Sequence, residues 1–144
     1  MIREFAGNDI EGVQKLIASV PEAAPWSAGG LLLALRNNLS LRVAEEHGSI
    51  CGVIVFRVMA DEAEILNLAV ASDLRRRGIG SSLLEEAVRA SESARARKIF
   101  LEVRESNDTA RNFYSRRRFI EAGRRRGYYR EPSEDALILL RMIE

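Results

Sequence analysis

The order of strand-like and helix-like segments restricts the possible folds of this chain more than any other feature of its sequence. Seven short segments have the apolar composition of β-strands, namely residues 2–5, 41–45, 50–58, 63–70, 99–104, 119–125 and 136–142. Four stretches with helical periodicity lie between them, at residues 8–20, 27–38, 80–94 and 106–114. The resulting order β-α-α-β-β-β-α-β-α-β-β predicts a mixed α/β domain.

Residues at the segment boundaries agree with this order. Asn8 and Asp9 are both candidate N-caps of the first helix, and Pro21 ends that helix. Ser106 or Asn107 is expected to cap the last helix. Ala94 is the last member of the apolar stripe expected for the third helix. The turn at residues 47–49 joins two strands into a hairpin and is expected to place its histidine at the surface.

The composition is that of a soluble globular protein. Hydrophobic residues make up 47% of the 144 residues and charged residues 30%, and the net charge of +1 gives no overall field that would favour DNA. No repeat, low-complexity segment or linker divides the chain, so residues 1–144 are expected to form one domain. No signal peptide or membrane-spanning run is found, which favours a cytoplasmic protein without a membrane partner.

Cys51 is the only cysteine, so an internal disulfide and a cysteine metal cluster are both excluded. Because it lies in the apolar segment 50–56, a buried and inert thiol is expected. No group of residues has the spacing of metal ligands, and no metal is expected.

Residues 68–81 are the most informative segment for function. An apolar strand ends, a polar loop with three arginines follows, and a helix begins at Gly78 and Gly80. Glycine lets a ligand approach the backbone closely, and the first N–H groups of a helix have no intrahelical partners. Together they would form a cradle for an anion such as a pyrophosphate. The alternative is a solvated arginine run before an ordinary helix. The segment is neither a P-loop nor a dinucleotide fingerprint.

The same segment resembles the coenzyme A motif of the GNAT acetyltransferase superfamily, Gln/Arg-x-x-Gly-x-Gly/Ala. Other pieces are similar, in the same order, to those of the RimI-type ribosomal-protein alanine N-acetyltransferases. They are Pro-Trp-Ser at 25–27, Leu-Asn-Leu-Ala-Val at 66–70, Leu-Glu-Val-Arg-Glu-Ser-Asn at 101–107, Phe-Tyr at 113–114 with Phe119, Tyr-Tyr at 128–129 and Glu-Asp-Ala at 134–136. In one departure, Arg118 stands where that family has glycine, so a non-glycine residue must make the turn in a strained or altered conformation.

The resemblance implies the GNAT fold, with a mixed, mostly antiparallel central sheet of about seven strands flanked by four helices. It also implies acetyl-coenzyme A as co-substrate, with the thioester held by the strand backbone, the pyrophosphate by the glycine loop and the pantetheine arm by Asn107. The implied coenzyme-binding residues are Leu68, Ala69, Val70, Arg75, Arg76, Arg77, Gly78, Ile79, Gly80, Ser81 and Asn107.

The resemblance further implies a general base at Glu102 and a general acid at Tyr114 for direct attack of an amine on the thioester. An α-amino group has a pKa of about 8, so a modest base is enough to deprotonate it. Glu64 on the neighbouring strand is the reserve base. Without the resemblance, a solvated glutamate and a core tyrosine would be the ordinary interpretations.

The implied acceptor is a protein N-terminus, usually the alanine of a small-subunit ribosomal protein. Trp26, Tyr128 and Tyr129 would wall a peptide groove, although ordinary packing explains them nearly as well. The arginine runs 116–118 and 124–126 are solvated by default, with an acidic substrate segment or ribosomal RNA as the minority interpretation. Two alternatives remain: an enzyme that acetylates lysine or a small-molecule amine, and a non-catalytic acetyl-coenzyme A-binding module. The sequence leaves the oligomeric state open.

Overall fold

The computed structural model describes residues 1–20, 30, 33, 36–72 and 77–143 of the chain. Its strands are β1 (Ile2–Glu4), β2 (Ser40–Glu46), β3 (Ser49–Met59), β4 (Glu62–Val70), β5 (Lys98–Arg104), β6 (Ile120–Arg130) and β7 (Ser133–Met142). Its helices are the short 3₁₀ helix η1 (Gly7–Asp9), α1 (Ile10–Ser19), α3 (Ile79–Ser93) and α4 (Asp108–Ser115). The described part thus holds three α-helices where four were expected, because most of the expected helix at 27–38 lies outside the described residues.

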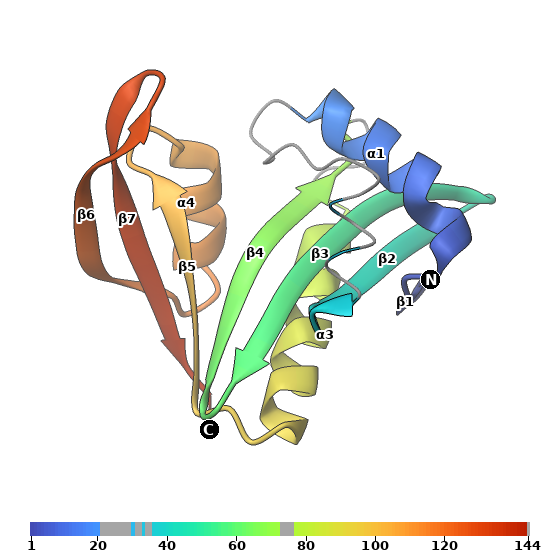
Figure 1. Ribbon diagram of the computed structural model, residues 1–144, viewed down its shortest axis with the longest axis horizontal. Coiled ribbons are helices and arrows are strands. Elements are labelled where there is room, and N and C mark those ends of the chain that lie inside the picture. Colours follow the sequence, from blue (N-terminus) through green and yellow to red (C-terminus); the bar gives the residue numbers. More distant parts are fainter. Residues whose placement is uncertain (21–29, 31–32, 34–35, 73–76, 144) are drawn as a thin grey trace.

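All seven strands form one sheet in the order β1-β2-β3-β4-β5-β7-β6 (Figure 1). Every neighbouring pair is antiparallel except β4 and β5, which are parallel. The predicted α/β fold with a mixed, mostly antiparallel sheet is therefore confirmed. Among the described residues, no helix is both long enough and apolar enough to cross a membrane.

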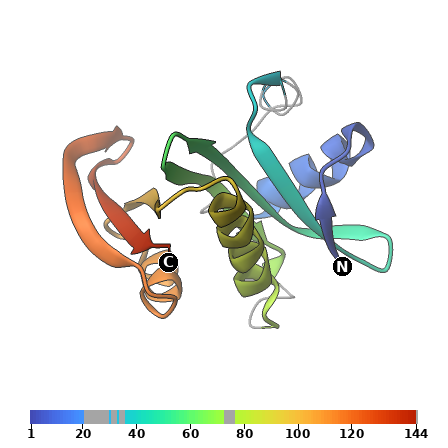
Figure 2. The same ribbon diagram turned by 90° about the horizontal axis from the view of Figure 1, so that it is seen from below.

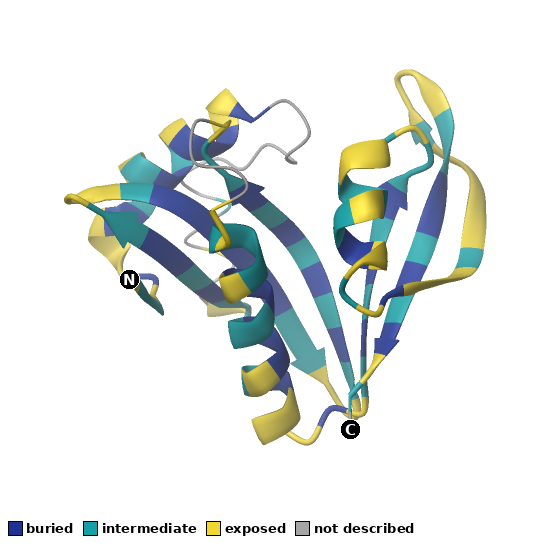
Figure 3. Ribbon diagram, turned by 180° about the vertical axis from the view of Figure 1, so that it is seen from behind, coloured by how far each residue is buried: buried dark blue, intermediate teal, exposed yellow. Residues whose placement is uncertain are grey.

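Helices cover both faces of the sheet, as the two perpendicular views show (Figures 1 and 2). On one face, α1 buries Val13, Leu16 and Ile17 in a cluster that contains residues of β2 and β3. On the other face, α3 buries an apolar stripe that includes Leu83 and Leu84. Burying one such side chain contributes about 1.5–3 kcal/mol. The layered pattern of burial is visible in Figure 3.

The sheet opens between its two central strands. The parallel ladder joins only Glu62–Glu64 of β4 to Lys98–Phe100 of β5. Beyond it the two strands separate into a V, with β1–β4 on one arm and β5–β7 on the other (Figure 1). The register of β4 against β3 also shifts, since Phe56 pairs with Ile65 but Val55 pairs with Asn67. The extra residue is a β-bulge, which bends a strand and increases its twist.

Several element ends differ by a few residues from those expected, and two of these differences change where named residues lie. β6 continues to Arg130 instead of ending at residue 125, so Tyr128 and Tyr129 lie on a strand. This edge strand is exposed on nearly every residue and has register shifts, so it lacks the alternation that identifies a strand in sequence. Helix α3 ends at Ser93, and Ala94 is an exposed C-cap rather than part of the apolar stripe.

Candidate active site

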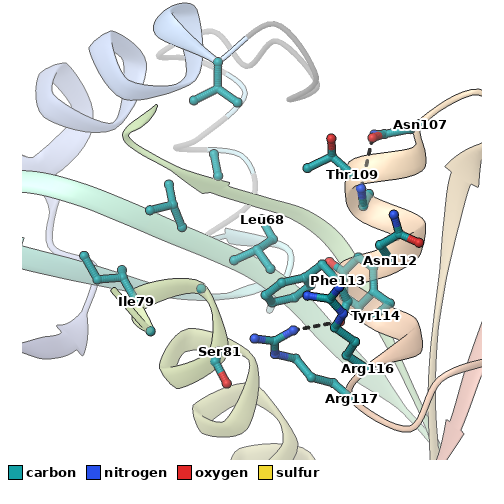
Figure 4. Close-up of a pocket in the computed structure, with 16 residues that line it drawn as sticks. Leu68, Ile79, Ser81, Asn107, Thr109, Asn112, Phe113, Tyr114, Arg116 and Arg117 are labelled. Carbon is teal, nitrogen blue, oxygen red and sulfur yellow. Dashed lines mark hydrogen bonds between the residues drawn. The ribbon is translucent and has the colours of Figure 1, made fainter. Parts of the chain in front are cut away.

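A cavity of about 620 Å³ opens in the V between the two arms of the sheet (Figure 4). Strand β4 and the first turn of α3 form one wall, and α4 forms the other. The lining residues are Val20, Leu68, Ala69, Val70, Gly78, Ile79, Gly80, Ser81, Asn107, Thr109, Ala110, Asn112, Phe113, Tyr114, Arg116 and Arg117. The structure therefore brings together most of the residues expected to bind the coenzyme.

The first turn of α3 presents its backbone to this cavity. Gly78 is the N-cap in the left-handed conformation, with φ of 83°, and the helix starts at Ile79. A side chain is strained at such a φ, which explains the glycine. A Cβ atom on Gly80 would lie 3.4 Å from the ring of Phe113, so α3 and α4 come within van der Waals contact of each other. The N–H groups of this turn are available for an anion.

Arg77, the loop arginine that the structure describes, does not line this cavity. Arg77 is exposed and lines a second cavity, on the side of α3 that faces β1 and β2, together with charged residues such as Glu46 and Arg89. Arg75 and Arg76 lie outside the described residues.

Asn107 caps α4, and it is one of the two residues that were expected to do so. Its side-chain Oδ1 accepts a hydrogen bond from the Ala110 N–H at 3.1 Å. This bond satisfies one free N–H of the helix and fixes the side chain. Because the oxygen is used by the cap, the amide NH₂ group remains to donate into the cavity that Asn107 lines.

Tyr114 lies at the inner end of the cavity and is almost fully buried. Its ring packs edge-on against Phe113 and Phe119, with centroids 5.0 and 5.1 Å away. Burial raises the pKa of Tyr114, since the phenolate is poorly solvated there. The hydroxyl thus keeps its proton at neutral pH, as a proton donor requires. The expectation that such a tyrosine belongs to the core also holds: the ring is core and the residue lines the cavity.

Glu102 lies on the opposite face of the sheet from Tyr114. Its neighbours Leu101 and Val103 are buried in the cluster that contains Tyr114, so the side chain between them points the other way. Glu102 Oε1 forms an ion pair with Arg125 Nε at 3.0 Å, and its side chain is 16% exposed. Glu102 is not part of the cavity lining.

Glu64, the reserve base, faces the same side as Glu102. It accepts two hydrogen bonds from Arg57, at 2.7 and 3.0 Å. It lies where β4 is still paired with β5, opposite Phe100. Its position inside the ladder makes it less accessible to a group bound in the opening.

The two tyrosines of β6 lie beside Glu102. Tyr128 and Tyr129 pack edge-on with centroids 5.1 Å apart. The Arg104 guanidinium lies 4.1 Å from the Tyr129 ring centre. Burial, followed by the nearby negative charge of Glu102, raises the pKa of Tyr129. Tyr129 therefore lies near Glu102, and neither tyrosine belongs to the lining of the cavity on the other face. Trp26, the third expected wall residue, lies outside the described residues.

Sequence reasoning missed seven residues of the cavity lining, three of which have large side chains. Phe113, Arg116 and Arg117 all line it, whereas the arginines were interpreted as part of a solvated run. Their spacing of three and four residues places them on one face of the end of α4, which is the signal that could have found them.

Comparison with known proteins agrees with this geometry. Residues 11–119 match the acetyltransferase (GNAT) family. A Bacillus subtilis protein that has a provisional name as a ribosomal protein bS18-alanine N-acetyltransferase is 31% identical over 96% of this chain and 92% of its own length. The Escherichia coli (strain K12) protein named for that activity is 36% identical over 65% of each chain. The crystal structure of the Escherichia coli ribosomal-protein-S18-alanine N-acetyltransferase covers all of this chain and 94% of its own, with a TM-score of 0.87 and 28% identity.

The chain therefore belongs to the GNAT family of acetyltransferases. Its predicted resemblance to the ribosomal-protein alanine N-acetyltransferases is confirmed by these relatives, and so is the prediction that it is an N-acetyltransferase. The family as a whole uses acetyl-coenzyme A.

Proposed function

We propose that this enzyme transfers the acetyl group of acetyl-coenzyme A to the N-terminal α-amine of a protein, with the alanine of ribosomal protein bS18 as its target. The observation that carries this proposal is one continuous cavity, which runs from the first turn of α3 along β4 to the hydroxyl-bearing ring of Tyr114. The relatives named for bS18 supply the acceptor.

The cavity has the donors that the coenzyme requires. The N–H groups after Gly78 suit a pyrophosphate, and the free amide of Asn107 suits a pantetheine carbonyl. Leu68 and Ala69 lie beyond the parallel ladder, where β4 pairs with β3 only. The β5-facing side of this stretch is open to backbone hydrogen bonds with an extended ligand.

The two catalytic residues approach the reacting atoms from opposite faces. Glu102 takes the proton that keeps the amine from attacking, the new N–C bond forms as the C–S bond breaks, and Tyr114 donates a proton to the departing sulfur. The second proton of the nitrogen passes to solvent, and the proton taken up by Glu102 is returned, through solvent, to Tyr114, so that both residues regain their starting states. Glu102 is held by Arg125 in the free protein, so an incoming α-ammonium competes with Arg125 for the carboxylate.

An α-amine fits this site better than a lysine side chain. The lysine amine has a pKa of about 10.4, against about 8 for an α-amine, so much less of it is reactive at neutral pH. A single carboxylate that is already paired with a guanidinium gives little help in removing the proton from a lysine side chain. Tyr128 and Tyr129 beside Glu102 supply the flat walls of a groove for the first residues of a peptide.

Acetyl transfer onto a panel of N-terminal hexapeptides tests the proposal. Each peptide offers both an α-amine and an internal lysine, and the bS18 N-terminus with its alanine replaced serves as the control. We expect acetate on the N-terminal alanine, as located by mass spectrometry. Acetate only on lysine, or only on added polyamines, would contradict the proposed acceptor and leave the family assignment intact.

A further inference from the structure

We infer that Arg116 and Arg117 bind a second phosphate of the coenzyme, its ribose 3′-phosphate, and make this enzyme selective for the 3′-phosphorylated form. The inference rests on the proposed function, because it takes coenzyme A as the occupant of the cavity. It extends that function from the glycine turn to a pair of cations on the facing wall.

Arg117 is held in a fixed pose beside the glycine turn. Its Nη1 donates a hydrogen bond to the Phe113 carbonyl at 2.8 Å, and its guanidinium lies 3.9 Å from the Phe113 ring centre. The same ring lies 3.4 Å from the Cβ position of Gly80. One aromatic ring thus separates the guanidinium from the first turn of α3, and Arg117 shares the cavity lining with Gly80 and Ser81 (Figure 4).

The backbone of Arg117 is anchored as well. Arg141 is buried, and it forms an ion pair with Glu85 of α3 at 2.9 Å and donates to the Arg117 carbonyl at 3.4 Å. This arrangement ties the end of α4 to α3 across the V. A pre-ordered guanidinium loses less entropy when it binds a ligand.

The cations at this end of α4 have spare donors. Within the described ranges, neither Arg116 nor Arg117 has a carboxylate within 4.0 Å, whereas Arg57, Arg104 and Arg125 are all paired. The Nε of Arg117 is buried and has no hydrogen-bond partner in that part of the chain. Arg116 is exposed at the mouth of the same cavity.

The charge of the site fits a phosphate monoester. The last carbonyls of α4 carry the negative end of the helix dipole, which repels an anion, so two guanidiniums are required to reverse the local potential. A phosphate monoester carries about −1.5 to −2 charges at neutral pH, and arginine binds such groups in bidentate geometry. The pyrophosphate is already provided for by the N–H groups of α3, which leaves the 3′-phosphate for the arginine pair.

Calorimetric titration with coenzyme A and with 3′-dephospho-coenzyme A tests the inference without using activity. The proteins are the wild type, the double variant Arg116→Gln/Arg117→Gln, and the control Arg97→Gln, which removes an exposed arginine that lines neither cavity. We expect the wild type and the control to bind coenzyme A about 10–100-fold more tightly than the dephospho form, the range of one or two charged hydrogen bonds. The double variant should bind both ligands equally.

Three results would overturn the inference: no discrimination by the wild type, discrimination retained in the double variant, or equal losses for both ligands, which would place the arginines on the pyrophosphate. Failure of the folded wild type to bind either ligand would instead refute the proposed function, and the inference with it. Circular dichroism and thermal melting show whether each variant is folded.

Discussion

At the V, the two faces of the sheet differ in whether their charged side chains are already in ion pairs. On the face covered by α3 and α4, the cavity is lined by the first turn of α3 and by Asn107, Tyr114, Arg116 and Arg117, and neither arginine is in an ion pair in the described part of the chain. On the other face, Glu64 is paired with Arg57 and Glu102 with Arg125.

Because of this difference, we expect the cavity side to set the affinity for the coenzyme and the other side to set the choice of acceptor. The cavity side is pre-organised by backbone and capping geometry, so a ligand binds there without breaking existing pairs. On the other side, arginines neutralise the two glutamates, so the amine of an acceptor must displace an arginine from its carboxylate. The Arg125 side chain is 55% exposed and that of Glu102 only 16%, so water can solvate the displaced guanidinium, and the exchange is sensitive to the charge of the acceptor.

The largest effect is expected from Tyr114→Phe, which removes the acid of the cavity side and keeps its packing. Loss of a general acid lowers kcat about 10²–10⁴-fold and changes KM little. Steady-state kinetics with saturating acetyl-coenzyme A and peptide measure this, and Phe119→Leu, which alters packing against the Tyr114 ring without being part of the cavity lining, is the control. Nearly full activity in Tyr114→Phe would make the tyrosine a packing residue.

The next effect is expected from Gly80→Glu, which adds bulk and negative charge where the pyrophosphate binds. Like charges brought together cost several kcal/mol, so coenzyme affinity should fall by more than about 100-fold in calorimetry. Gly80→Ala is the matched control, because its Cβ would be in ordinary contact with Phe113 at 3.4 Å. Unchanged affinity in a folded Gly80→Glu protein would remove this turn from the site.

A smaller effect is expected from Glu102→Gln on the acceptor side. About a tenth of an α-amine with a pKa of about 8 is already neutral at pH 7, so the loss of the base should cost roughly 10–100-fold there and less as the pH rises. A pH–rate profile measures the recovery, with Glu64→Gln as the matched control that retains activity. A loss that is the same at every pH would indicate positioning, and a larger loss in Glu64→Gln would exchange the two roles.

The smallest effect is expected from Arg118→Gly at the turn after α4. Arg118 has φ of 69°, the left-handed conformation that its departure from the family glycine predicted. An L-residue there costs about 1–2 kcal/mol, of which the greater freedom of glycine in the unfolded chain cancels roughly half. We expect about 0.5–1 kcal/mol of added stability in denaturant melts and unchanged kcat and KM. A loss of stability would mean that the Arg118 side chain makes a compensating contact.

Features set by neighbouring residues could be read from the sequence. The glycine turn and the cap at Asn107 depend on a few adjacent residues, as does the left-handed Arg118. The buried Cys51 and the exposed His47 follow from local apolar and turn patterns and are confirmed. The extent of β6 was wrong because that edge strand is exposed on both faces and its periodicity is lost.

Only the tertiary structure decided how these pieces meet. The V depends on where β4 leaves β5 and on the bulge near Leu66, and pairing between distant strands sets both. The strand alternation places Glu102 on the face opposite Tyr114, but which face carries the cavity follows from the helices packed on it. Arg117 enters the cavity because Arg141 and Phe113 hold it there. The sequence by itself determined the local conformation, because the interactions that stabilise a turn or a helix cap are made between neighbouring residues. The tertiary structure decided how the two walls of the cavity come together, because the energy that holds the walls in place comes from contacts between residues far apart in the chain.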